Sequence, residues 1–406
     1  MRVLILSWEY PPIVEGGLAR HVHKLATNLA RQGHEVDVLT RGDAVAATGG
    51  QEEQVAVHRV PEPARPRDLD TFIAWIAAMN EDMVARGRAL LAEREVDVIH
   101  GHDWLVASAA DRLAREAGVP MVTTIHATEY GRHQGWVDQH PQSHIHGIET
   151  WMARRSEHVI ACSHYMRGHV ADVYGIGEER VSVIPNGIDA TDLRPADDLA
   201  GVRAQYAAPD ERLVLLVGRL VYEKGFQFAL DALAGPDGAI ERVGKVRFLI
   251  AGSGTHEQEL RRQATELGLD AHGTFLGWIG DDALHTLYRI ADLCVVPSIY
   301  EPFGLVALEA MASGCPCIVA DSGGLREVVP DAAVGMRFPS RDPRALAALM
   351  ERLLTDDELR DRLVVAASEH VRRFDWAEIA RDTAEVYARL VPEPRASSPA
   401  ARASTG

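Results

Sequence analysis

Cysteine is scarce in this chain, with four residues among 406. So low a count excludes a disulfide framework of the kind that holds small secreted proteins together. Cys315 and Cys317 form a C-x-C pair, but no second pair is present to complete a structural zinc site. Because three of the four cysteines lie in apolar, strand-like runs, we expect buried free thiols.

Basic residues are also few, since 42 lysines and arginines stand against 59 aspartates and glutamates, a net charge of −17. Nucleic acids and anionic membranes bind basic patches, so neither is expected as the main partner. Long apolar runs are missing too. A helix needs about 18 consecutive apolar residues to span a bilayer, and the sequence contains no such run. The apolar run Val3–Leu6 is too short for a secretory signal. We expect a cytoplasmic protein without a transmembrane segment, and its oligomeric state stays open.

The chain is rich in short apolar runs that alternate with helical patterns, which predicts an α/β fold with parallel sheets. The alternation occurs twice, in residues 1–193 and 212–373. We expect two doubly wound, Rossmann-like domains whose binding loops face a central cleft. Residues 194–211 show no strand pattern and are predicted to link the domains. A last helix is expected at 376–391, and the Ala/Ser/Pro-rich tail 392–406 is predicted to be disordered.

The most informative motif is "SIYEPFGLVALEAMASG", which follows an apolar strand pattern. We predict a helix that begins near Phe303. The free backbone N–H groups of Phe303, Gly304 and Leu305 would then form an anion site. Glu301 precedes this helix and Glu309 lies two turns along it, so the two carboxylates could grip hydroxyls on either side of a bound phosphate. The alternative is a helix with an acidic N-terminus and no ligand.

A cationic pair, Arg219 and Lys224, follows the strand pattern "RLVLLVG". Such a pair suits a diphosphate, because each charge-assisted hydrogen bond contributes about 1.5–3 kcal/mol. The alternative is a solvated loop with ordinary charges.

Two glycine motifs follow strand patterns and are each weak evidence by themselves. Glycine leaves room for a ligand to approach backbone N–H groups. The glycines are Gly16 and Gly17 at the start of the first helix, and Gly252 and Gly254 in "AGSG".

Histidines and an aspartate cluster after two strands of the first domain, at what should be one sheet edge. They are His100, His102, Asp103 and His126. Such a set could bind a divalent metal, as in metal-dependent hydrolases. The H-x-H spacing also recurs in helical patterns, so it does not discriminate. A single D-x-D, Asp68 and Asp70, is predicted to cap the long helix from Thr71 to Arg94.

Seven motifs, in a fixed order between residues 7 and 314, together resemble retaining glycosyltransferase family 4 of the GT-B fold. The motifs are "SWEYPPIVEGGL", "HGHDW", "TIHATE", "IPNGID", "GRLVYEKG", "AGSG" and "EPFGLVALEAMASG". The likeness is greatest to bacterial glycogen-synthase-like α-glucosyltransferases. It implies transfer of a hexosyl group, above all α-glucosyl, from UDP- or ADP-glucose to a glucan or oligosaccharide acceptor, with no metal or other cofactor.

The resemblance also implies roles for individual residues. His126, Glu301, Arg219 and Lys224 would be catalytic, with His126 and Glu301 on the transferred sugar and the two cations on the diphosphate. Donor binding would involve Gly16, Gly17, Gly252, Gly254, Phe303, Gly304, Leu305 and Glu309, the last on the ribose. Glu9 and Asp103 would lie on the acceptor side, in the first domain. One departure is Glu15, where starch and glycogen synthases usually carry a lysine.

Other functions remain open from the sequence. The same fold and predicted phosphate-binding residues would suit mannosyl or N-acetylglucosaminyl transfer to another acceptor, or a sugar-nucleotide epimerase. A catalytically inactive nucleotide-sugar-binding regulator and a metal-dependent hydrolase are further alternatives. The motifs do not identify the nucleotide base or the acceptor.

Overall fold

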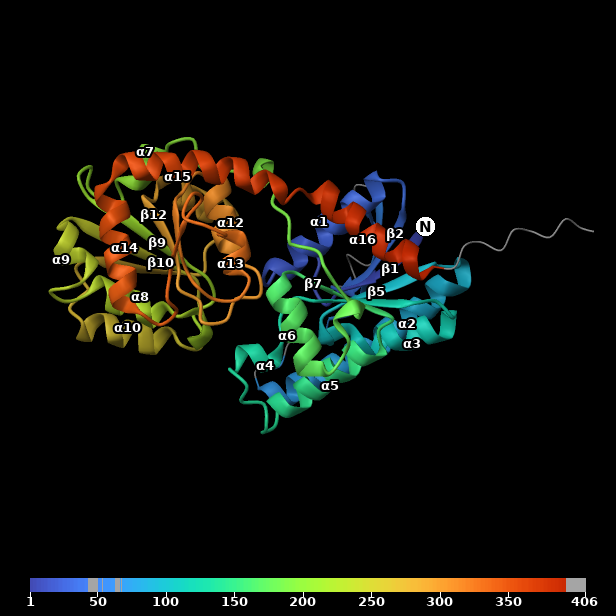
Figure 1. Cartoon of the computed structure of the whole chain (residues 1–406). Helices are drawn as coiled ribbons and strands as arrows, with labels where there is room; N and C mark the ends of the chain where they lie inside the picture. Colours follow the sequence, from blue (N-terminus) through green and yellow to red (C-terminus); the bar gives the residue numbers. More distant parts are fainter. Residues whose placement is uncertain (43–49, 53, 63–65, 67, 392–406) are drawn as a thin grey trace, which may run out of the picture.

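The computed structural model describes residues 1–42, 50–52, 54–62, 66 and 68–391. It contains two α/β units, each built on its own sheet, as expected from the repeated alternation. In Figure 1 the first unit is blue to green and the second yellow to orange, and the red C-terminal helices run from the second unit back to the first. The tail predicted to be disordered lies outside the described residues.

The first sheet has eight strands in the order β3-β4-β2-β1-β5-β6-β7-β8, all parallel except for the antiparallel pair β3–β4. The strands are β1 (Arg2–Leu6), β2 (Glu35–Arg41), β3 (Gly50–Glu52), β4 (Val55–Val60), β5 (Val98–His102), β6 (Met121–Ile125), β7 (His158–Ala161) and β8 (Val181–Val183). Residues of β1 alternate between two buried clusters, one on each face of the sheet. Burial on both faces explains the continuous apolar runs.

Helices cover both faces of this sheet. They are α1 (Gly17–Arg31), α2 (Leu69–Glu93), η2 (Trp104–Val106), α3 (Ala107–Ala117), α4 (Glu129–Arg132), α5 (Gln142–Arg155), α6 (His164–Tyr174) and η3 (Glu178–Arg180). Helix α2 starts two residues before the predicted Thr71. Its N-cap is Asp68, whose carboxylate accepts the Thr71 N–H at 2.8 Å. This capping role is the one expected for the first aspartate of the D-x-D motif.

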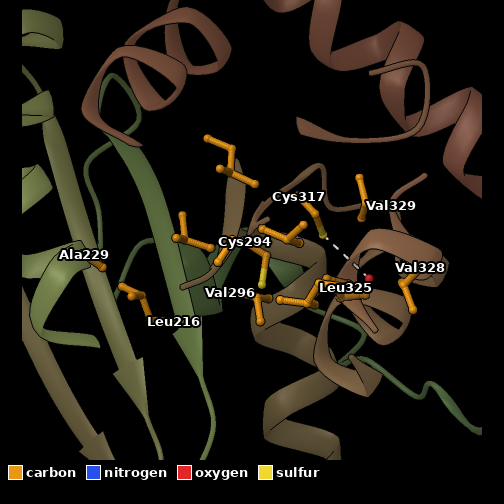
Figure 2. Packing of buried hydrophobic residues seen from close by; sticks show 14 of the residues in the cluster. Leu216, Ala229, Cys294, Val296, Cys317, Leu325, Val328 and Val329 are labelled. Atoms are coloured by element: carbon orange, nitrogen blue, oxygen red, sulfur yellow. Dashed lines mark hydrogen bonds between the residues drawn. The ribbon is translucent and has the colours of Figure 1, made fainter. Parts of the chain in front are cut away.

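The second sheet has six parallel strands in the order β11-β10-β9-β12-β13-β14. They are β9 (Arg212–Val217), β10 (Val246–Ala251), β11 (Gly273–Gly277), β12 (Leu293–Val296), β13 (Cys317–Ala320) and β14 (Met336–Phe338). Figure 2 shows Cys294 and Cys317 among the apolar side chains of this core. All four cysteines are buried free thiols, as expected.

The second unit carries most of the remaining helices. They are η5 (Tyr222–Lys224), α8 (Phe226–Leu233), α9 (Ala239–Val243), α10 (Glu257–Glu266), α11 (Asp281–Ile290), α12 (Leu305–Ala312), α13 (Leu325–Val328), α14 (Pro343–Thr355), α15 (Asp357–His370) and η6 (Val371–Arg373). Within the described part of the chain, no helix combines the length and apolarity needed to cross a membrane.

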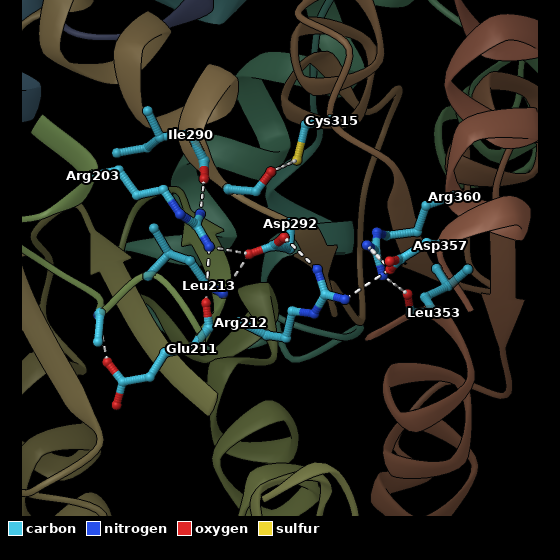
Figure 3. A network of polar contacts seen from close by, with 12 residues as sticks. Arg203, Glu211, Arg212, Leu213, Ile290, Asp292, Cys315, Leu353, Asp357 and Arg360 are labelled. Carbon is cyan, nitrogen blue, oxygen red and sulfur yellow. Dashed lines mark hydrogen bonds and ion pairs between the residues drawn. The ribbon is translucent and has the colours of Figure 1, made fainter. Parts of the chain in front are cut away.

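The segment predicted as a linker lies between the two units in the chain and is packed onto the second. It follows η4 (Ala190–Asp192) and contains α7 (Leu199–Arg203). The Arg203 guanidinium donates to the Ile290 carbonyl and, at 2.7 Å, to the Asp292 carboxylate, which also pairs with Arg212 (Figure 3). These tertiary contacts fix residues that have no apolar periodicity, so sequence patterning did not reveal them.

The last helix, α16 (Trp376–Leu390), lies on the first unit and packs against α1. His100 Nδ1 lies 2.6 Å from the Tyr387 hydroxyl, a buried hydrogen bond between β5 and α16. The chain therefore passes between the units twice. The two passages lie side by side, because the Ile188 N–H donates to the Phe374 carbonyl at 2.8 Å.

Candidate active site

Loops at the carboxyl ends of strands in both sheets border a shared cleft of about 760 Å³. Such loops are where ligands bind in open α/β sheets. The first unit contributes the loop after β1, and the second contributes the loops after β9, β10 and β11 with the start of α12. Predicted site residues that line the cleft are Gly16, Gly17, Arg219, Gly252, Leu305 and Glu309.

Two helix N-termini face each other across this cleft. Helix α1 begins at Gly17, and a Cβ atom there would lie only 2.7 Å from Leu305 Cδ1 at the start of α12. Each helix N-terminus carries unpaired N–H groups and about half a positive charge. The pair therefore creates a local anion site in a protein of net charge −17.

Helix α12 starts two residues later than predicted. Its N-cap is Gly304, with φ of 120°, a backbone conformation that favours glycine. The unpaired N–H groups thus begin at Leu305, and the prediction that Phe303 opens the helix is wrong. Phe303 is 3% exposed, and its ring lies 5.8 Å from that of Phe374 in an edge-to-face contact. Tertiary packing of this aromatic ring keeps the residue out of the helix.

Lys224 and Glu301 form one charged unit. The Lys224 ammonium lies 2.7 Å from Glu301 Oε2, which also accepts the Ser298 hydroxyl at 3.0 Å. Arg219 is less constrained, since its side chain is 60% exposed and its guanidinium lies 3.6 Å from Glu223. Cations from the loop after β9 thus lie beside the carboxylate that the sequence assigned to the sugar.

Glu309 is held by a residue that sequence reasoning missed. Its carboxylate accepts the Tyr288 hydroxyl at 3.0 Å and lies 3.5 Å from the guanidinium of Arg20, which also pairs with Asp281. Burial raises the pKa of Glu309. Arg20 belongs to α1 and its partners to the second unit, so these ion pairs cross the cleft. In the sequence, the one feature that pointed to Arg20 was its position one helical turn after Gly17.

The glycines of "AGSG" serve different purposes. Gly252 lines the cleft with φ of 136°, and a Cβ atom there would overlap the Gly218 carbonyl. Gly254 does not line the cleft, and a Cβ atom there would overlap the backbone of Leu220. Both glycines therefore let the loops after β9 and β10 pack closely, and of the two only Gly252 lines the cleft.

The two carboxylates predicted on the acceptor side support loops and do not line the cleft. Asp103, with φ of 59°, accepts the His126 N–H at 2.8 Å, and burial raises the pKa of Asp103 to about 6. Glu9 is 3% exposed and accepts the Glu15 N–H at 2.6 Å. The Glu15 side chain pairs with Arg41.

The histidines are regrouped by the fold. His102 Nδ1 lies 3.1 Å from His126 Nε2, and the His21 ring lies 4.6 Å from that of His126. His100 is excluded from this group because both its ring nitrogens have partners, Tyr387 and Thr124. Burial lowers the pKa of His126 to about 3, so the imidazole is neutral at physiological pH.

Contacts between the units hold the Glu301 loop against the first unit. The Tyr300 hydroxyl accepts the Thr128 N–H at 3.1 Å, and the Ser163 hydroxyl donates to the Pro302 carbonyl at 2.6 Å. Glu301 thus lies between two residues that the first unit fixes. Its position depends on how the units close.

Comparisons with known proteins identify the family. A family model described as "Glycosyltransferase Family 4" matches residues 15–192, and one described as "Glycosyl transferases group 1" matches residues 202–370. The chain is 40% identical to a glycogen synthase of Mycobacterium tuberculosis, over 95% of this chain and 94% of that protein. It is 32% identical to a D-inositol 3-phosphate glycosyltransferase of Corynebacterium efficiens, over 95% of each.

A solved structure is similar along almost the whole chain. Sucrose-phosphate synthase from Thermosynechococcus elongatus superposes with a TM-score of 0.80 at 26% identity, covering 96% of this chain and 98% of that one. Family models, relatives and fold therefore agree. The chain belongs to the GT-B glycosyltransferases of family 4 and group 1, and is a hexosyltransferase.

Proposed function

We propose that the protein moves an α-glucosyl group, with retention of configuration, from UDP- or ADP-glucose to a glucan or oligosaccharide. The observation that carries this proposal is the pair of opposed helix N-termini, Gly17 and Leu305, beside the cations Arg219 and Lys224. A nucleoside diphosphate supplies the negative charge that these groups suit. The 40% identity to a glycogen synthase favours glucose and a glucan acceptor.

In this proposal the leaving diphosphate is stabilised without metal or other cofactor. Fixed N–H groups and cations stabilise charge where it develops as the glycosidic bond breaks. The Lys224 ammonium and the Arg219 guanidinium take the diphosphate, while Glu301 accepts hydrogen bonds from the sugar hydroxyls. The neutral imidazole of His126 contacts the sugar, and Glu309 accepts hydrogen bonds from the ribose hydroxyls. Neither Glu301 nor Glu309 is assigned the role of a covalent nucleophile.

A second candidate acceptor is an inositol phosphate. The specific observation in its favour is the 32% identity to a D-inositol 3-phosphate glycosyltransferase over 95% of both chains. The greater identity to the glycogen synthase makes the glucan the preferred acceptor.

Nucleotide release tests the proposal and the metal question together. The protein is incubated with UDP-glucose, ADP-glucose or GDP-mannose, with and without excess EDTA, and in each case with maltooligosaccharides, with D-inositol 3-phosphate or without an acceptor. We expect maltooligosaccharides to increase release from one glucose donor, and EDTA to leave the rate unchanged. Release only with D-inositol 3-phosphate would transfer the proposal to the second acceptor. Complete loss in EDTA that added Mg²⁺ or Mn²⁺ restores would show that metal is required.

A further inference from the structure

Three histidines from separate elements of the first unit converge, and one of them, His21, lines a cavity that adjoins the donor cleft. His21 comes from α1, His102 from the end of β5 and His126 from the loop after β6. One ring nitrogen of each lies within 4.8 Å of the others. Among the residues that the structure describes, they are the one group of three or more potential metal ligands with such mutual spacing. Imidazole nitrogens are preferred ligands of zinc.

The hydrogen bonding of the cluster is incomplete. His102 is fully buried, and its Nε2 atom has no hydrogen-bond partner. An orphaned buried polar atom costs about 1–3 kcal/mol and is rare in native proteins. The His102 ring is held by the contact of its Nδ1 atom with His126 Nε2, so Nε2 is the one nitrogen of this ring without a partner.

The spacing fits a tetrahedral ion. Two nitrogens bound to one Zn²⁺ lie about 3.3 Å apart, and His102 Nδ1 is already 3.1 Å from His126 Nε2. The widest separation in the group must shorten by at most about 1.5 Å to reach that spacing. Of the rings that must move, the half-buried His126 side chain has the room to supply such a movement.

His21 has the outer hydrogen bond that metal-binding histidines usually make. Its Nδ1 lies 2.8 Å from the Asn186 amide oxygen, which can only accept, so Nδ1 carries the hydrogen. The lone pair is therefore on Nε2, and the ring orientation is fixed. Both His21 and Asn186 line a cavity of about 460 Å³ that shares Gly17, Arg20 and Glu309 with the donor cleft. This cavity provides an entry path for an ion.

We propose that His21, His102 and His126 bind one Zn²⁺ ion, and that bound zinc inhibits the enzyme. Three imidazoles leave one coordination position for water or a ligand. Zinc occupies the nitrogen lone pairs of the cluster, including that of His126, and so displaces the sugar from its contact there. The inhibition rests on the proposed function, whereas binding of the ion does not.

Binding is tested with Co²⁺, because a tetrahedral Co²⁺ site absorbs strongly in the visible whereas aqueous octahedral Co²⁺ is pale. Titration of the full, metal-stripped chain with CoCl₂ should produce such bands, saturating at one equivalent, and one equivalent of ZnCl₂ should remove them. Only the pale octahedral spectrum, or binding without defined stoichiometry, would overturn the proposal.

Variants locate the site. His102→Gln and His126→Gln should each abolish the bands, and Asn186→Ala should weaken Co²⁺ binding by about 10–100-fold by releasing His21. His144→Gln, an exposed histidine outside the cluster, is the matched control and should bind Co²⁺ as the parent does. Replacing the fully buried His102 could disturb folding. His126 is only half-buried, so His126→Gln provides a second test of the site that does not depend on the His102 variant. Undiminished bands in His126→Gln would refute the assignment.

Inhibition is measured as nucleotide release with and without ZnCl₂. One equivalent should suppress turnover of the parent chain and of His144→Gln, and EDTA should restore it. The zinc effect, taken relative to each variant's own activity, should be lost in Asn186→Ala at the same concentration. Co²⁺ binding without zinc inhibition would refute the inhibitory role alone, whereas a chain inactive even in EDTA would count against the proposed function.

Discussion

At the scale of single residues, Glu301 and Glu309 have distinct surroundings although they are close in sequence. Glu301 pairs with Lys224 in the second unit, whereas Glu309 pairs with Arg20 of the first unit and accepts the Tyr288 hydroxyl. Only Glu309 lines the cleft. Their substitutions should therefore affect different steps.

Glu309→Gln should weaken binding of both the nucleoside diphosphate and the intact donor. Loss of a carboxylate–hydroxyl pair costs about 1.5–3 kcal/mol, or roughly 10–150-fold in affinity. The amide oxygen still accepts the Tyr288 hydroxyl, so folding should be preserved. Titration calorimetry with the free nucleotide measures the change.

Glu301→Gln should leave nucleotide affinity near that of the parent and lower kcat. The sugar is absent from the free nucleotide, and interactions that strengthen only in the transition state affect the rate. Steady-state rates and calorimetry on both glutamine variants separate the roles. Loss of nucleotide binding in Glu301→Gln alone would show that the two assignments are reversed.

Glu149 should make stability depend on pH. Its carboxylate is buried and accepts the Glu129 N–H and the Tyr174 hydroxyl, and burial raises its pKa from 4.5 to about 7. The unfolded chain ionises first as pH rises, so the folded state loses up to about 3 kcal/mol between pH 4.5 and 7. Glu149→Gln should become progressively more stable than the parent over that range, as measured by urea unfolding.

The exposed Glu358 supplies the control for this pH profile, since Glu358→Gln should differ from the parent by a constant amount. Parallel stability curves for Glu149→Gln and the parent, from pH 4.5 to 8, would show that Glu149 ionises normally in the folded protein.

The sequence motifs indicated site residues where one short segment contains both the functional side chain and the local pattern that places it at the cleft. Gly16 and Arg219, from loops that follow strands, Gly17, at the start of α1, and Glu309, from helix α12, line the cleft. Arg20 lies one turn after Gly17, but its partners Glu309 and Asp281 belong to the opposite unit, so the sequence did not reveal these ion pairs. Glu9 and Asp103 are buried by tertiary packing, which also directs their carboxylates to backbone N–H groups.

At the scale of elements, the start of α6 is a contact between the units. Glu327 of α13 accepts the N–H groups of His164 and Tyr165, each at 2.9 Å. A carboxylate at a helix N-terminus is favourable because it meets unpaired N–H groups and the positive end of the helix dipole. Ser163 separately caps α6 from within the first unit, by accepting the Met166 N–H at 3.1 Å.

Glu327→Ala should therefore open the cleft without unfolding α6. We expect a larger radius of gyration for the ligand-free variant in small-angle X-ray scattering, and a lower kcat/KM, because closure positions the Glu301 loop. Saturating donor should return the radius toward that of the parent. Glu358→Ala, on the exposed side of α15, is the control. If both variants and the parent scatter identically without ligand, the Glu327 contact does not hold the two units together.

Element boundaries were predictable where a local cap is present, as at Asp68 before α2. They were wrong where distant residues decide. Phe303 is excluded from α12 by its contact with Phe374, and α7 is held by the Arg203–Asp292 pair. Both contacts join residues far apart in the chain, so neither leaves a periodic signal.

At the scale of the whole molecule, alternating apolar runs were enough to predict two doubly wound units. That their binding loops face a shared cleft was also expected, but the contacts that fix this placement were not, because pairs such as Glu327 and His164 are 163 residues apart. The two side-by-side passages near Ile188 and Phe374 join the units on one side, and the Glu327 contact with the start of α6 holds them together elsewhere. Closure of two such units excludes water and brings catalytic groups from both together.

Product analysis tests the central claim most directly, namely that the cleft transfers a hexosyl group with retention. The protein is incubated with maltooligosaccharides and the glucose donor that supports release, and the product is examined by chromatography and proton NMR. We expect oligosaccharide chains extended by α-linked glucose, with one nucleoside diphosphate released for each glucose residue added. A β-linked product, or an isomerised nucleotide sugar released without acceptor extension, would contradict the claim.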